Sequence, residues 1–146
     1  MERREAGIGL VEILVILGLL GIMAGSAAPG IHRISREWAL LGGARVVESS
    51  LFWGRTHAIA ANDSLTFIVD DNGRQFYWQQ PDGTRYDASV RRMPAGIRIS
   101  SSPRKPLRFY PRGNAVPAAT FVVEGEAGIY RVVVSAQGRI RMQRDK

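Results

Sequence analysis

The chain has 146 residues, which is enough for one small folded domain once its apolar N-terminal stretch is set aside. It carries 20 Lys and Arg against 13 Asp and Glu, a net charge of +7, which favours acidic or polyanionic partners. Because it has no cysteine, a disulfide framework and a thiolate metal site are both excluded.

The N-terminal segment is a polar stretch, residues 1–7, followed by an apolar run from Ile8 to Ile31 whose one charge is Glu12. A helix of that length, at ~1.5 Å per residue, can span a bilayer. The run is apolar on every side, which argues against a helix in the core of a soluble domain. A secretory signal is the alternative, since Ala24 to Ala28 imitates its cleavage site, but a carboxylate in the apolar core is unusual for such a signal.

Gly7 followed by IGLVEILVILGLLGIMAGSAAP resembles the class III signal of type IV pilins and type II secretion pseudopilins. The resemblance implies cleavage after Gly7 by prepilin peptidase on the cytoplasmic side, and methylation of the new N-terminus at Ile8. It also implies that Glu12 pairs with the N-terminal amine of a neighbouring subunit, because in lipid each charge needs the other. Pro29 lies where such pilins often carry a helix-bending proline.

Residues 32–61 are predicted to continue this helix as an amphipathic one. Apolar residues recur there at spacings of mostly three and four, as on one helix face: Ile34, Trp38, Leu41, Ala44, Val47, Leu51, Ala58 and Ile59. Glycine in a helix costs ~1 kcal/mol relative to alanine. We therefore expect bends or breaks at Gly42, Gly43 and Gly54.

Residues 62–146 are predicted to form an antiparallel β domain. Short β-type runs alternate with turn residues: LTFIVD, QFYWQQ, GIRIS, LRFY, TFVVEG, YRVVVS and RIRMQ. The first two runs flank Asp71–Gly73, a hairpin signal because Asn and Gly tolerate positive φ. The aromatics Phe76–Trp78 alternate across a strand, so at least one face packs in the core. The prolines of Ser100–Pro106 predict a loop.

No residue pattern of an enzyme is found in the sequence. His32 and His57 have no companion at metal-ligand spacing and are interpreted as surface or helix-face residues. Asp70, Asp71 and Asp82 lack the spaced oxygen ligands of a calcium loop and are typical of turns. We therefore predict that the protein is not an enzyme and holds neither a metal nor a cofactor.

The C-terminal half is strongly basic, with 12 basic and three acidic residues from Ala88 onward. In an extended segment Arg139 and Arg141 project to one side and Ile140 to the other. Guanidinium groups match phosphate oxygens with paired donors, so the two arginines can grip successive phosphates. The alternative is that basic strands and tails aid solubility or contact anionic lipid. The other basic positions before this segment include Arg91, Arg92, Arg98, Arg104, Lys105, Arg108 and Arg112.

The order of class III signal, long helix, β domain and terminal Gly-Arg-x-Arg resembles the FimT/GspH branch of minor pilins and pseudopilins. The resemblance implies an α+β fold, in which a long hydrophobic N-terminal helix precedes a small antiparallel β domain. In family members that take up DNA, the Gly-Arg-x-Arg element is implicated in contacting it. Gly138, Arg139 and Arg141 match that element, and Arg144 and Lys146 would extend the same basic patch.

The resulting hypothesis is a FimT-like minor pilin that is built into a pilus and binds extracellular double-stranded DNA for uptake in natural transformation. Such binding would be non-specific, because phosphate contacts do not read sequence. The alternative is a GspH-like pseudopilin, a structural component of a type II secretion system. In both cases we expect a single-pass inner-membrane protein with its C-terminal domain in the periplasm. It would then join other pilins or pseudopilins through the N-terminal helix.

Overall fold

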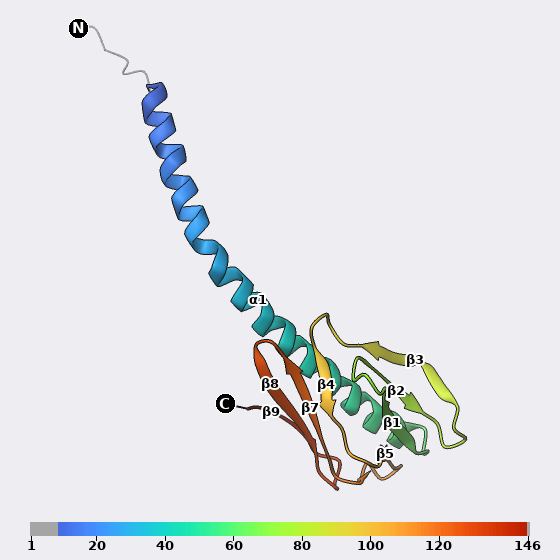
Figure 1. The fold of residues 1–146 in the computed structure, drawn as a ribbon. Helices are drawn as coiled ribbons and strands as arrows, with labels where there is room; N and C mark the ends of the chain where they lie inside the picture. Colours follow the sequence, from blue (N-terminus) through green and yellow to red (C-terminus); the bar gives the residue numbers. More distant parts are fainter. Residues whose placement is uncertain (1–8, 146) are drawn as a thin grey trace, which may run out of the picture. The chain divides into compact units, whose positions relative to one another are not determined.

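The protein consists of one long helix followed by β-strands (Figure 1). The computed structural model describes the backbone of residues 9–145 and the side chains of residues 9–23 and 33–145. Helix α1 runs from Leu10 to Ala60. Within the described residues the strands are β1 Leu65–Val69, β2 Gln75–Gln79, β3 Arg85–Arg92, β4 Arg98–Ser101, β5 Leu107–Phe109, β6 Ala115–Val116, β7 Ala119–Gly125, β8 Gly128–Val134 and β9 Ile140–Arg144. This order confirms the predicted α+β fold.

The strands form two antiparallel sheets, with the orders β3-β2-β1-β5-β6 and β4-β7-β8-β9. The predicted hairpin is confirmed: β1 pairs with β2, Phe67 lies opposite Trp78, and Gly73 in the turn has φ of 65°. Phe67 also contacts Phe121 of the other sheet, with ring centroids 5.1 Å apart. The sheets therefore share one core, and β9 lies at the edge of the four-stranded sheet.

The chain divides into two compact units, Met1–Ser35 and Arg36–Lys146. In the first unit the large apolar side chains described within Leu10–Met23 are exposed. In the described part of the chain, no helix contains a stretch that is both long and apolar enough to cross a membrane. The predicted membrane segment, 8–31, lies partly outside the described residues.

One face of α1 lies in the core of the second unit. Its buried hydrophobic residues are Leu40, Ala44, Val47, Leu51 and Ala58. Burying a large apolar side chain contributes about 1.5–3 kcal/mol, so this face holds the helix to the sheets. The predicted apolar face was partly wrong, because Ile34, Trp38 and Ile59 are 56%, 68% and 47% exposed. A stripe at spacings of three and four drifts around the axis, because a turn takes 3.6 residues. Ile59 directly follows buried Ala58 and lies beside the buried stripe, where its Cδ1 approaches Gly113 of the β5–β6 turn.

The predicted breaks in α1 do not occur. The helix continues through Gly42, Gly43 and Gly54. Two of these glycines are contact sites, because a Cβ on Gly43 would lie 2.8 Å from Cγ2 of Ile97 and a Cβ on Gly54 would overlap the ring of Trp78. Close packing against the sheets therefore outweighs the ~1 kcal/mol propensity cost of each glycine.

Two strands were missed in the sequence. β3 and β6 form the opposite edges of the five-stranded sheet, and most residues of β3 are exposed. An edge strand exposed on both faces has no clear apolar alternation, so its sequence signal is weak. The predicted loop Ser100–Pro106 starts two residues later than expected, because β4 extends to Ser101, which pairs with Val122 after an irregularity at Ser100. The prolines of the predicted loop follow the end of this strand.

Candidate polyanion interface on strand β9

The Gly-Arg-x-Arg element forms the end of a turn and the start of β9. Gly138 is buried, has φ of 76°, and donates its N–H to the carbonyl oxygen of Ser135 at 2.8 Å. The backbone N–H of Arg139 donates to Oγ of Ser135 at 3.1 Å, and the N–H of Ser135 donates to the carbonyl of Arg139 at 2.9 Å. Arg141 then lies opposite Val133 of β8. The backbone of the element is therefore fixed at both arginines.

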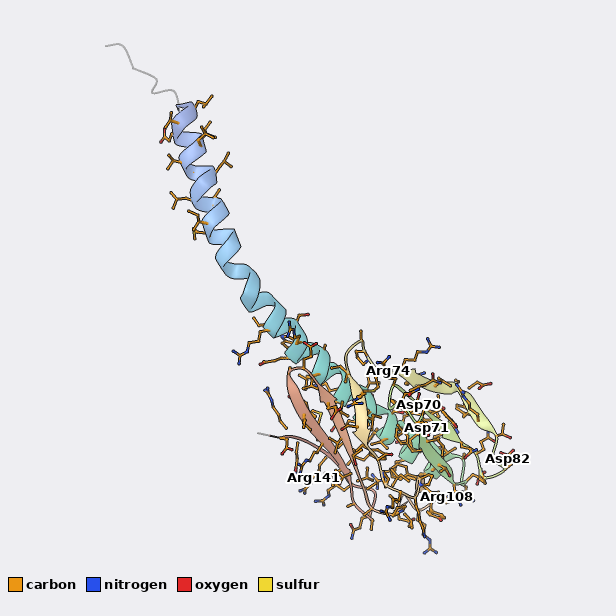
Figure 2. The ribbon with its side chains drawn as sticks, in the orientation of Figure 1. Asp70, Asp71, Arg74, Asp82, Arg108 and Arg141 are labelled. Carbon is orange, nitrogen blue, oxygen red and sulfur yellow. The ribbon has the colours of Figure 1, made fainter. Side chains whose placement is uncertain are left out.

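Arg139 and Arg141 project from the outer face of the four-stranded sheet. Exposure alternates along the segment: both arginines are exposed, while Ile140 and Met142 between and beyond them pack against the core. Arg141 points away from the core in Figure 2. Within the part of the chain that the structure describes, neither guanidinium group makes a hydrogen bond or an ion pair. The expected placement of the pair on one side, with Ile140 on the other, is confirmed.

Arg144 lies on the opposite face of β9. In register it faces Tyr130, with its guanidinium carbon 6.0 Å from the centre of that ring. Its Nη2 also lies 4.0 Å from Oε1 of Glu37 in α1. The structure thus separates Arg144 from the two outer arginines, because successive side chains of a strand alternate between faces. Lys146 lies outside the described residues.

A second turn packs against the Gly-Arg-x-Arg element. It joins β5 to β6 and contains Gly113, whose φ is 77°. A Cβ on Gly138 would overlap the carbonyl oxygen of Gly113, so the two glycines are in close backbone contact. Arg55 of α1 donates from Nε to that same carbonyl at 2.9 Å. Sequence reasoning missed this junction, because no local pattern relates three residues so far apart in the chain.

The carboxylates described in the C-terminal half are all paired. Each one forms an ion pair with another arginine, at 2.5–2.8 Å. The pairs are Arg98–Glu124, Arg36–Glu126 and Arg131–Asp145. No acidic residue described in this half therefore neutralises the charge at the start of β9.

One of these pairs predicts a pH dependence of stability. A hydrogen bond from Ser100 and the guanidinium group of Arg98 hold the pKa of Glu124 below its ordinary value of 4.5. A carboxyl with a lowered folded pKa stabilises the fold above its unfolded pKa, and that stability is lost as the pH falls through the folded pKa. We expect Glu124→Gln to lose less stability than the wild type between about pH 7 and about pH 3. The difference should stay below about 1 kcal/mol because the pair is partly exposed.

Urea unfolding at the two pH values, followed by circular dichroism, measures this difference. Asp87→Asn serves as the control. Asp87 lies in β3 of the other sheet, is exposed, and has its Oδ1 3.6 Å from Nε of Arg85 in the same strand. Equal losses in the wild type and in Glu124→Gln would contradict the assignment.

The aspartates considered for a metal site stabilise turns instead. Oδ1 of Asp70 accepts the N–H of Arg74 at 2.9 Å, and Oδ1 of Asp82 accepts the N–H of Thr84 at 2.7 Å, which lowers the pKa of Asp82. Figure 2 places Asp82 well away from Asp70 and Asp71. Among the described residues, no three His, Asp or Glu side chains gather as a set of metal ligands.

The two histidines belong to α1. The ring of His57 stacks on Trp53 with centroids 4.8 Å apart and lies 5.6 Å from the ring of Tyr86. Its interpretation as a helix-face residue is confirmed. The side chain of His32 lies outside the described residues.

Of the four signal residues given a role, three lie outside the described residues. These are Gly7, Ile8 and the side chain of Pro29. Glu12 is described: it lies in the first turn of α1, is exposed, and donates its N–H to the carbonyl of Gly9 at 2.9 Å. A carboxylate is favourable there, because the N-terminus of a helix carries a partial positive charge.

Comparisons with known proteins agree with this architecture. A family model described as Type II transport protein GspH matches residues 35–138. The chain is 31% identical to the pilin-like protein PilA1 of Thermus thermophilus, over 98% of this chain and 100% of that protein.

Two solved structures share the fold. One is the type IV minor pilin FimU of Pseudomonas aeruginosa, with a TM-score of 0.62, 18% identity, and coverage of 75% of this chain and 92% of FimU. The other is the minor pseudopilin EpsH of Vibrio cholerae, with a TM-score of 0.56, 15% identity, and coverage of 69% and 93%. At these identities the likeness concerns the fold alone.

Proposed function

Because the chain belongs to the GspH family of type II transport proteins, and is thus a minor pilin or pseudopilin, we propose that it binds extracellular double-stranded DNA for uptake in natural transformation. In this proposal it is a minor pilin without catalytic activity. The observation that carries the proposal is the segment that leads into β9, where Arg139 and Arg141 are exposed and have no carboxylate partner among the described residues.

The geometry of the pair suits a phosphate backbone. Residues two apart in a strand are about 6.6–6.8 Å apart along its axis, so Arg139 and Arg141 present two planar donor groups in a row. Gln143 follows on the same face and is exposed. Contacts of this kind position a duplex without reading its bases, so the binding is independent of sequence.

The test is a DNA mobility shift with the full chain in a nonionic detergent, over a series of salt concentrations. Each phosphate contact contributes about 0.9 to the slope of log K against log salt. We expect Arg139→Ala/Arg141→Ala to bind more weakly and with a slope smaller by about 2. Arg91→Ala/Arg92→Ala, which removes the same charge from β3 in the other sheet, is the control. An unchanged slope in the first variant, or no binding by the wild type at low salt, would contradict the proposal.

A second candidate function is that of a structural pseudopilin in a type II secretion system. It is favoured by the description of the matching family and by the fold shared with EpsH. The family match ends at Gly138, so Arg139 and Arg141 lie beyond it. This candidate predicts no salt-dependent DNA binding, and the same mobility shift therefore decides between the two.

We also propose how the chain reaches its assembly. Prepilin peptidase cleaves after Gly7, Ile8 is methylated, and the apolar segment 8–31 holds the protein in the inner membrane with its C-terminal domain in the periplasm. The helix then packs on other pilins, Glu12 neutralises the amine of a neighbouring subunit, and Pro29 bends the helix. The exposed apolar side chains of α1 from Leu10 onward support this, because such side chains need lipid or another helix around them.

Mass spectrometry of the protein produced together with prepilin peptidase tests the processing step. We expect a mature chain that begins at Ile8 and carries one added methyl group, whereas the Gly7→Glu variant retains its first seven residues because a bulky charged residue blocks the peptidase. Glu12→Gln is the control, since it leaves the cleavage position intact. A wild-type chain that still begins at Met1 would refute the proposed cleavage.

A further inference from the structure

We propose that the polyanion site is composed of two turns from different sheets, in which Arg112 of the β5–β6 turn is a third phosphate-contacting residue and Arg55 positions the turns. This inference rests on the proposed DNA binding and extends it from a strand to a surface. It starts from the contact between Gly113 and Gly138, which no sequence motif relates.

The two turns have the same construction. In each, a glycine with φ near 76° donates its N–H three residues back, Gly113 to Tyr110 and Gly138 to Ser135, both at 2.8 Å. Positive φ values and the lack of a side chain allow the two backbones to touch. A further bond joins them, since Ala115 donates its N–H to the carbonyl of Ala136 at 2.9 Å. The turns therefore form one rigid junction.

Arg55 fixes this junction to the helix. Its side chain is part-buried and donates from Nε to the carbonyl of Gly113 at 2.9 Å. A Cβ on Gly138 would lie 2.8 Å from the same Nε, so the guanidinium group lies against both glycines. Because a charged donor makes a stronger hydrogen bond than a neutral one, this contact holds the turns in a single arrangement.

Each of the two glycines in contact has an exposed arginine as its chain neighbour. Arg112 directly precedes Gly113 and Arg139 directly follows Gly138, and both side chains are exposed. Among the described residues, neither guanidinium group has a hydrogen-bond or ion-pair partner. Arg112 thus extends the line of Arg139 and Arg141 across to the other sheet, where a polyanion longer than two phosphates would meet it.

The experiment measures binding of a mixed-sequence duplex DNA by the full chain in nonionic detergent, across salt concentrations. We expect Arg112→Ala to lower the slope of log K against log salt by about 1. Arg92→Ala, which removes the same charge from the far edge of the five-stranded sheet, should leave the slope unchanged. If Arg112→Ala behaves like Arg92→Ala while Arg139→Ala/Arg141→Ala still loses binding, this inference fails and the proposed function stands. If the wild type does not bind, both fail.

Crosslinking provides a readout that does not depend on affinity. The chain has no cysteine, so Arg112→Cys and Arg92→Cys each accept a single photoreactive label. We expect DNA adducts from the label at position 112 and none from the label at position 92. Equal adducts at the two positions would overturn the proposed site.

The positioning role of Arg55 has its own variant. Arg55→Lys keeps the charge but loses the fixed fork of donors that contacts both glycines. We expect Arg55→Lys to show the same reduced slope of log K against log salt as Arg112→Ala. Its helix content should equal that of the wild type. A wild-type slope would show that Arg55 does not position the site, because long-range electrostatics are the same in both proteins.

Discussion

Replacing Trp78 with alanine is expected to lower the free energy of unfolding by about 3–5 kcal/mol, the largest loss expected from any single truncation in this fold. The side chain is completely buried and its ring lies 5.0 Å from Phe67 and 5.9 Å from Phe109. Its Nε1 donates to Oγ of Ser50 in α1 at 3.2 Å. The substitution therefore leaves a cavity and removes a contact between the helix and a sheet. Urea unfolding followed by far-ultraviolet circular dichroism measures the loss.

Trp38→Ala is the matched control for this prediction. Trp38 undergoes the same chemical change but is 68% exposed, so we expect a loss within about 0.5 kcal/mol. Similar losses in the two variants would show that the core is not built around Trp78.

The packing of the Trp78 ring against Gly54 can be tested with a pair of substitutions. Gly54→Ala alone should destabilise the protein by about 1–3 kcal/mol, because its methyl group overlaps the six-membered ring of the indole. In a Trp78→Phe background much of that ring is absent, so the same substitution should cost less. Residues in contact commonly show coupling energies of about 0.5–3 kcal/mol, and additive losses would contradict the contact.

Gly138→Ala is expected to lower the free energy of unfolding by about 2–5 kcal/mol. A left-handed backbone conformation costs an alanine about 1–2 kcal/mol, and overlap with the fixed carbonyl of Gly113 adds about 1–3 kcal/mol. Relief of the overlap requires movement of one turn away from the other. Urea unfolding again provides the measurement.

Gly96→Ala separates the cost of the left-handed backbone conformation from the cost of the overlap. Gly96 has a φ of 77°, almost that of Gly138, but no atom lies within 4 Å of the Cβ position. Gly96→Ala should therefore lower the free energy of unfolding only by the backbone cost, about 1–2 kcal/mol. Equal losses at the two positions would mean that the contact between the turns adds nothing to stability.

Local patterns predicted those parts of the structure that local geometry decides. The hairpin around Gly73 and the placement of Arg139 and Arg141 on one side of Ile140 follow from turn chemistry and from the period of a strand. The breaks expected in α1 were wrong because a helix propensity cannot report that Ile97 and Trp78 pack against Gly43 and Gly54.

The candidate site was predictable only in its linear part. The basic excess and the Gly-Arg-x-Arg element are visible in the sequence, but Arg144 faces Glu37 and Tyr130 on the other side of the strand. The link between Arg55, Gly113 and Gly138 depends on how the helix and both sheets come together. Contacts between residues this far apart in the chain follow from the complete fold, and no periodicity encodes them.

The position of β9 gives its arginines a second consequence. An edge strand offers unpaired backbone groups to any other extended chain, which makes it a starting point for aggregation. Arg139 and Arg141 place two positive charges along this edge, so a second copy that approached strand to strand would bring like charges together. The residues proposed to attract DNA would therefore also disfavour strand-to-strand pairing of neighbouring copies at this edge.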